Sequence, residues 1–133
     1  MLKDLASIME KISIEFSGNM IEAVLNDTDT ARKILESLPV EGSASRWGDE
    51  IYFSIPLEAG LENGTAALEK GDLAFWPPGK AFCIFFGPTP ASTDDRPKPA
   101  GPVTLIGKIA NIKDIDVLRL ASDGQPISIS RIL

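Results

Sequence analysis

The chain has 133 residues, of which 44% are hydrophobic and 24% are charged, as in an ordinary globular domain. This composition excludes a disordered chain, a collagen-like repeat and a long coiled coil. Nineteen acidic residues against thirteen basic ones give a net charge of −6, so we expect no nucleic-acid partner.

Residues 1–9 lack the apolar stretch and the cleavage site of a secretory signal. No segment approaches the roughly 18 consecutive apolar residues of a membrane span. We therefore expect a cytoplasmic protein with no membrane partner. Residues 1–10 are interpreted as an N-terminal extension, with Met1 and Met9 as alternative translation starts, and residues 11–133 as a single domain.

A hairpin is predicted at the start of this domain. Residues 11–16 alternate apolar and polar side chains, which is typical of a half-buried strand. A second strand is predicted over residues 20–25, after the turn at Gly18 and Asn19.

One helix is predicted over residues 28–38. Thr28 is suited to the N-cap position, and Pro39 ends the helix. The apolar residues of this segment recur with helical spacing and form one face: Ala31, Ile34, Leu35 and Leu38.

Short strands dominate the rest of the chain. They are predicted over residues 40–47, 50–55, 72–76, 81–86, 103–110 and 127–130. Residues 58–70 are polar and glycine-rich, and residues 87–102 contain five prolines, so both are predicted loops. A short helical turn is expected within residues 112–120. Seven or eight strands with one helix indicate a closed or nearly closed β-barrel.

The strands also predict which side chains share a face. Within residues 50–55, Ile51, Phe53 and Ile55 point one way and Tyr52 and Ser54 the other. Residues 81–86 are apolar on both faces, which is typical of a strand buried on both sides. There, Phe82, Ile84 and Phe86 point one way, and Cys83 and Phe85 the other.

The residue inventory limits the chemistry. The chain has no histidine, which excludes histidine-based catalysis, and its single cysteine excludes an internal disulfide and a Cys/His metal cluster. We expect neither a metal nor a cofactor. Cys83 is flanked by apolar residues and lacks a neighbouring base, so a buried, inert thiol is favoured. The loop carboxylates are interpreted as solvated charges: Glu58, Glu62, Asp94 and Asp95.

Two sequence blocks carry a resemblance to a known family. They are residues 71–90, which contain Trp-Pro-Pro-Gly and Phe-Gly-Pro-Thr-Pro, and residues 47–53. Together they resemble the small cyclophilin-like proteins of bacteria and archaea, from about residue 11 to residue 133. The resemblance implies a mainly β fold: a closed eight-stranded barrel with one short α-helix and a further helical turn. Few functions are assigned in this family.

The resemblance does not imply prolyl isomerase activity. Cyclophilins place an arginine, a glutamine, several aromatic residues and a histidine around a proline pocket. This chain has no histidine, and its only glutamine, Gln125, lies outside any matching motif. Arg46 is the arginine nearest to a matching block.

The candidate ligand-binding residues are those beside the rigid turns of the two blocks: Arg46, Trp47, Tyr52, Trp76, Phe82 and Phe85. Arg46 beside Trp47 suits a carbonyl or carboxylate group, and Trp76 before Pro77 suits the wall of an apolar pocket. Ordinary packing is the favoured explanation for the same residues: Arg46 would be a surface arginine stacked on a half-buried Trp47, and Trp76 would end a strand and point into the core. Two functions follow: a module that binds a small molecule or peptide in an aromatic and proline-lined groove, or a reduced prolyl isomerase in which Arg46 stabilises the twisted amide.

Overall fold

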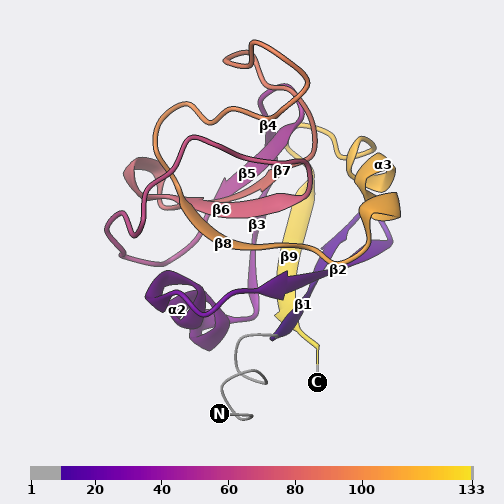
Figure 1. Cartoon of the computed structure of the whole chain (residues 1–133). Coiled ribbons are helices and arrows are strands. Elements are labelled where there is room, and N and C mark those ends of the chain that lie inside the picture. Colours follow the sequence, from indigo (N-terminus) through magenta and orange to yellow (C-terminus); the bar gives the residue numbers. More distant parts are fainter. Residues whose placement is uncertain (1–9, 133) are drawn as a thin grey trace.

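The structure is a computed structural model that describes residues 10–132, so residues 1–9 of the predicted extension lie outside the described residues. Within that range, nine strands form one antiparallel sheet that curls into a nearly closed barrel (Figure 1). The predicted mainly β barrel is confirmed. The strands are β1 (Lys11–Phe16), β2 (Asn19–Leu25), β3 (Val40–Ser43), β4 (Ser45–Arg46), β5 (Glu50–Ser54), β6 (Asp72–Trp76), β7 (Ala81–Phe85), β8 (Thr104–Ile109) and β9 (Pro126–Arg131).

The sheet runs in the order β3-β9-β1-β2-β8-β6-β7-β5-β4, so β3 and β4 are its two edges. Only Ala44 separates these edges in the chain. The backbone of Ala44 exchanges hydrogen bonds with Gln125 and Gly124, at 2.8 and 2.7 Å, which hold it beside the start of β9. The predicted strand 40–47 is therefore divided: β3 pairs with β9, and β4 pairs with β5. This division gives nine strands instead of the expected eight and leaves one seam without ladder hydrogen bonds.

Four short helical segments complete the described chain, and one of them, the 3₁₀ turn η1 (Pro77–Gly79), follows β6. Helix α2 (Asp29–Ser37) has Thr28 as its N-cap, whose hydroxyl accepts a hydrogen bond from the Ala31 N–H at 3.1 Å. Its apolar face packs on the barrel core, as predicted, and α2 lies at one end of the barrel (Figure 1). The predicted helical turn is η2 (Ile112–Asp114) followed by α3 (Ile115–Leu118). None of the helices in residues 10–132 has the length and apolar character needed to cross a membrane.

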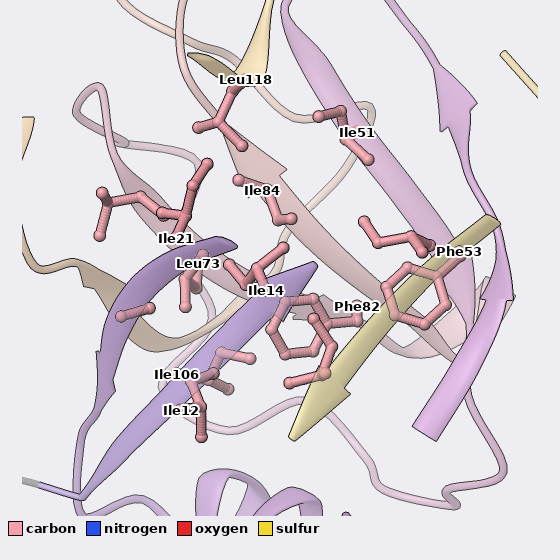
Figure 2. Close-up of a cluster of buried hydrophobic side chains, with 14 of the residues drawn as sticks. Ile12, Ile14, Ile21, Ile51, Phe53, Leu73, Phe82, Ile84, Ile106 and Leu118 are labelled. Carbon is pink, nitrogen blue, oxygen red and sulfur yellow. The ribbon is translucent and has the colours of Figure 1, made fainter. Parts of the chain in front are cut away.

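The main core fills the barrel interior. Inward-facing aliphatic and aromatic side chains from most of the strands meet there, among them Ile14, Phe53 and Phe82 (Figure 2). The rings of Phe53 and Phe82 lie with their centroids 5.8 Å apart. A Cβ atom on Gly42 would lie 2.9 Å from the Phe53 ring, so glycine allows β3 to approach β5 across the seam.

A second, smaller buried cluster lies on the outward face of β6, β7 and β8. Its buried members are Leu68, Ala74, Ala81, Cys83, Phe85 and Val103. Strand β7 is therefore buried on both faces, as its continuous apolar sequence predicts.

The proline loop (residues 87–102) helps to cover this second cluster. It contains neither a helix nor a strand, as predicted, and joins β7 to β8 (salmon to orange in Figure 1). It is nevertheless folded back onto the barrel, because Thr89, Pro97 and Pro99 are all buried.

Candidate functional site

A cavity of about 230 Å³ lies between the outward face of the sheet and the proline loop. We call it the outer cavity. Its walls are mostly aromatic and aliphatic, which is typical of a small-molecule site. The lining residues are Trp47, Glu50, Tyr52, Trp76, Cys83, Phe85, Pro99, Ala100 and Val103.

The turn between β4 and β5 supplies two of these residues. The backbones of Trp47 and Glu50 exchange hydrogen bonds of 3.0 and 3.2 Å, so the two residues face each other across the turn. Their side chains therefore lie on one face of the hairpin. Gly48 has a φ of +60°, and a Cβ atom there would lie 2.9 Å from the Thr89 backbone. Glycine at this position thus allows both the positive φ of the turn and the close contact between the turn and the proline loop.

The pairing of β5 with β7 supplies the floor of the outer cavity. Glu50 lies opposite Phe85, and Tyr52 lies opposite Cys83. Because side chains alternate along a strand, these four share the outward face, while Ile51 and its neighbours point into the barrel. The register therefore brings one acidic, one phenolic and one thiol group together on an otherwise apolar surface.

Trp76 forms a wall at the end of β6. The chain after it turns through the 3₁₀ segment η1 (Pro77–Gly79), which lies under the indole. A Cβ atom on Gly79 would lie 2.9 Å from the six-membered ring of Trp76, and one on Gly101 would lie 3.7 Å from its Nε1 atom. Glycine at position 79 thus leaves room for the ring, whereas the distance at Gly101 is an ordinary van der Waals contact.

The proline loop is held over the outer cavity by short polar contacts. The Thr89 hydroxyl donates to the Lys98 carbonyl oxygen at 2.6 Å, which closes the loop on itself. The Asp49 N–H donates to the Pro88 carbonyl oxygen at 3.0 Å, which ties the loop to the β4–β5 turn. These contacts set Pro99 and Ala100 above the sheet, where they complete the lining.

Glu50 is the only residue with a carboxyl group among the lining residues. It is 7% exposed, and burial raises the pKa of its carboxyl to about 7, although a hydrogen bond from the Cys83 thiol opposes the shift. None of the ion pairs formed within residues 10–132 includes Glu50. Its ionised form is therefore a buried negative charge without a cationic partner in the described part of the chain.

Cys83 is a poor nucleophile in this setting. Its side chain is buried, and desolvation together with the neighbouring Glu50 raises the pKa of the thiol well above its usual value. The thiol has two acceptors within reach, the Glu50 carboxyl and the Ala81 carbonyl oxygen at 3.7 Å. Cys83 therefore contributes a small apolar surface and a weak hydrogen-bond donor to the outer cavity.

Four of the six candidate ligand-binding residues come together in this cavity: Trp47, Tyr52, Trp76 and Phe85. Phe82 does not join them, since it lies on the inward face of β7 and packs in the main core (Figure 2). The alternation of side chains along β7 separates Phe82 from Phe85.

Arg46 does not line the outer cavity, and its guanidinium instead forms hydrogen bonds with other groups of the protein. Its guanidinium donates to the carbonyl oxygens of Gly48 at 3.0 Å and Ala121 at 2.9 Å, and pairs with Asp49 at 3.3 Å. Its Cζ atom also lies 5.0 Å from the centre of the Phe86 ring. The predicted stacking on Trp47 is replaced by this network, which joins the β4–β5 turn to the segment after α3.

The loop carboxylates do not form a shared site. Glu62 accepts hydrogen bonds from the first N–H groups of α2, at Asp29 and Thr30, each 3.0 Å long. These bonds hold the pKa of Glu62 below its usual value. Glu58 pairs with Lys80, and Asp94 pairs with Arg96. No cluster of three or more potential metal ligands was found within residues 10–132.

Five lining residues were not predicted as site residues: Glu50, Cys83, Pro99, Ala100 and Val103. Glu50 could have been predicted from the sequence, because it lies two positions before Tyr52 and therefore shares the face of Tyr52 in a strand. Pro99 and Val103 could not have been predicted in this way, since their places depend on how the proline loop folds back.

Comparison with known proteins agrees with the fold. The profile of a family described as Cyclophilin-like matches residues 10–130. A solved structure of a hypothetical protein from Archaeoglobus fulgidus is 36% identical, with 94% of this chain and 96% of that chain covered and a TM-score of 0.76. A search of curated proteins found no match. The resemblance read from residues 47–53 and 71–90 is confirmed: the chain belongs to the cyclophilin-like family.

Proposed function

We propose that this protein binds a small, ring-bearing molecule in the outer cavity. The observation that carries the proposal is the convergence of Trp47, Tyr52, Trp76 and Phe85 on one space of about 230 Å³. Cavities of roughly 150 Å³ with apolar walls can hold benzene, so this volume suits a ring with a short substituent. Flat aromatic walls supply contact area, and Glu50 supplies a polar group that can orient the ligand.

Binding is favoured over prolyl isomerisation by the position of Arg46. An isomerase needs donors that converge on the rotating amide in a desolvated pocket. The guanidinium of Arg46 is already bonded to the carbonyl oxygens of Gly48 and Ala121, and Arg46 does not line the cavity. The lining provides apolar walls and an acidic group, which suit a bound ligand better than a developing negative charge.

The two tryptophans of the chain both line the outer cavity, so their fluorescence reports on its occupancy. The probes are ring-sized compounds such as toluene, benzyl alcohol and benzylamine. We expect a saturable change in fluorescence, with saturation-transfer NMR confirming contact between probe and protein.

A variant that fills the cavity tests its location. Val103→Phe adds a ring inside the lining, whereas Val24→Phe adds the same ring to a half-buried valine outside it. Binding should be lost in Val103→Phe and kept in Val24→Phe, with near-native circular dichroism in both. If no probe saturates the wild-type signal, or if both folded variants bind equally, the proposal is wrong.

A further inference from the structure

The outer cavity contains an acidic group that the described part of the chain leaves without a counter-ion. Resting on the proposed function, we propose that its ligand is an organic cation, a ring-bearing amine whose ammonium group pairs with the Glu50 carboxylate.

Glu50 combines burial with access to the outer cavity. Only 7% of Glu50 is exposed, yet the residue lines the open space of the cavity. A carboxylate offers about four acceptor sites. Within residues 10–132, the only side-chain donor beside the carboxyl is the weak Cys83 thiol, which itself contacts the Ala81 carbonyl oxygen at 3.7 Å. Acceptor capacity therefore remains for a donor that arrives from the cavity.

The charges that line the outer cavity favour a cationic ligand. No lysine or arginine lines the outer cavity, and a neutral or anionic ligand would leave ionised Glu50 unpaired or repelled, at a substantial energetic penalty. An ammonium group would form a short, charge-assisted hydrogen bond with a carboxylate that is only 7% exposed. The net charge of −6 also favours the approach of cations over anions.

The walls of the outer cavity are rich in aromatic rings. Trp47, Trp76 and Tyr52 line the same space as the acid. Aromatic faces attract cations within about 6 Å, and tryptophan is the strongest of them. Aromatic walls with a single acid are the features expected of a site for a ring-bearing amine.

The proposal makes binding depend on pH through Glu50. The other titratable lining residues are Cys83 on β7 and Tyr52 on β5, and β6 and the proline loop contribute only the uncharged Trp76, Pro99 and Ala100. Because the pKa of Glu50 is raised to about 7, a small fraction of the free protein is ionised at pH 5.5 and almost all of it at pH 8.5. If only the ionised form binds a cation, affinity should rise about thirtyfold between these pH values.

The experiment compares three probes of similar size: benzylamine, benzyl alcohol and benzoate. Titration calorimetry and tryptophan fluorescence measure each dissociation constant at pH 5.5 and pH 8.5. We expect benzylamine to bind at least tenfold more tightly than benzyl alcohol at pH 8.5, with benzoate the weakest. At pH 5.5 the preference for benzylamine should largely disappear.

Glu50→Gln tests the assignment to this residue, and Glu58→Gln is the matched control, since Glu58 is an exposed glutamate outside the cavity. Glu50→Gln should abolish the pH dependence and the preference for benzylamine while still binding benzyl alcohol. Glu58→Gln should behave as the wild type. If benzyl alcohol or benzoate binds as tightly as benzylamine at pH 8.5, or if Glu50→Gln keeps the preference, the cation is the wrong ligand class and the proposed function survives. If no probe binds, the proposed function itself fails.

Discussion

The Cys83 thiol lies beside the Glu50 carboxyl on the outward face of the neighbouring strands β7 and β5. Glu50 is 7% exposed and Cys83 is 1% exposed, so both groups have lost nearly all contact with water. Burial disfavours the charged form of each group. The nearby carboxyl raises the pKa of the thiol further, whereas the thiol, as a weak donor, opposes the rise in the pKa of Glu50. Protonation of Glu50 is therefore linked to the stability of the fold.

Glu50→Gln should change how stability depends on pH. The raised pKa of Glu50, about 7 against an ordinary value of 4.5, means that the unfolded chain loses its proton at lower pH than the folded protein. The contribution of neutral Glu50 to the free energy of unfolding should thus be fully present below pH 4.5. It should be lost as the pH rises from 4.5 to about 7. Glutamine cannot ionise, so the variant should be more stable than the wild type at pH 8, by on the order of 2 kcal/mol.

Urea unfolding at pH 4.5 and pH 8, followed by tryptophan fluorescence, checks this difference. The advantage of Glu50→Gln should be nearly absent at pH 4.5, where the folded wild-type carboxyl is neutral and only about half of the unfolded chain has lost this proton. Glu58→Gln, at an exposed site, should show no such change with pH. An equal stability difference at both pH values would contradict the assignment.

Gly79→Ala should move the Trp76 ring. The new methyl group would lie 2.9 Å from the indole, which is too close for the ring to stay in place. We expect a loss of stability of about 1–3 kcal/mol, together with a shifted fluorescence maximum and weaker probe binding. Gly60→Ala is the control, since nothing lies within 4 Å of a Cβ atom there. Unchanged fluorescence in Gly79→Ala would show that the ring is not held as described.

Glu62→Ala should weaken the start of α2. The carboxylate accepts N–H hydrogen bonds from Asp29 and Thr30, which would otherwise lack partners within the helix. Replacing a side chain in this capping role usually costs about 1 kcal/mol. Because the pKa of Glu62 is lowered, this contribution is present above pH 4.5 and is lost as pH falls.

Chemical denaturation at pH 7 and pH 3 measures the effect of Glu62→Ala. Glu58→Ala removes an exposed ion pair with Lys80 and should change stability by less than about 1 kcal/mol. A Glu62→Ala variant as stable as Glu58→Ala at pH 7 would mean that the capping contacts contribute nothing measurable.

The protein should not accelerate prolyl isomerisation above the spontaneous rate in a protease-coupled peptide assay. Arg46 holds the carbonyl oxygens of Gly48 and Ala121, so its removal should act on stability, by about 1–3 kcal/mol, through the partners left unsatisfied. A clear rate enhancement that Arg46→Ala abolishes without unfolding the protein would restore the isomerase hypothesis.

Local sequence patterns determined most of the elements. Alternation over residues 11–16 and 50–55 predicted the strands and their inward faces, and Thr28 with Pro39 predicted the limits of α2 within a residue. Five prolines predicted the irregular path of residues 87–102. These features follow from backbone geometry and hydrogen bonding within a few residues, which is information that a short segment carries.

Only the tertiary structure decided which of these faces meet. Alternation states that Glu50 and Tyr52 share a face, but the β5–β7 register sets Phe85 and Cys83 opposite them. The division of residues 40–47 depends on Ala44, whose backbone bonds to the segment before β9 some eighty residues away. The acidic floor of the outer cavity depends on the proline loop as well, because Glu50 loses water only when distant segments cover it. Burial and pairing are properties of segments far apart in the chain, and no local pattern contains them.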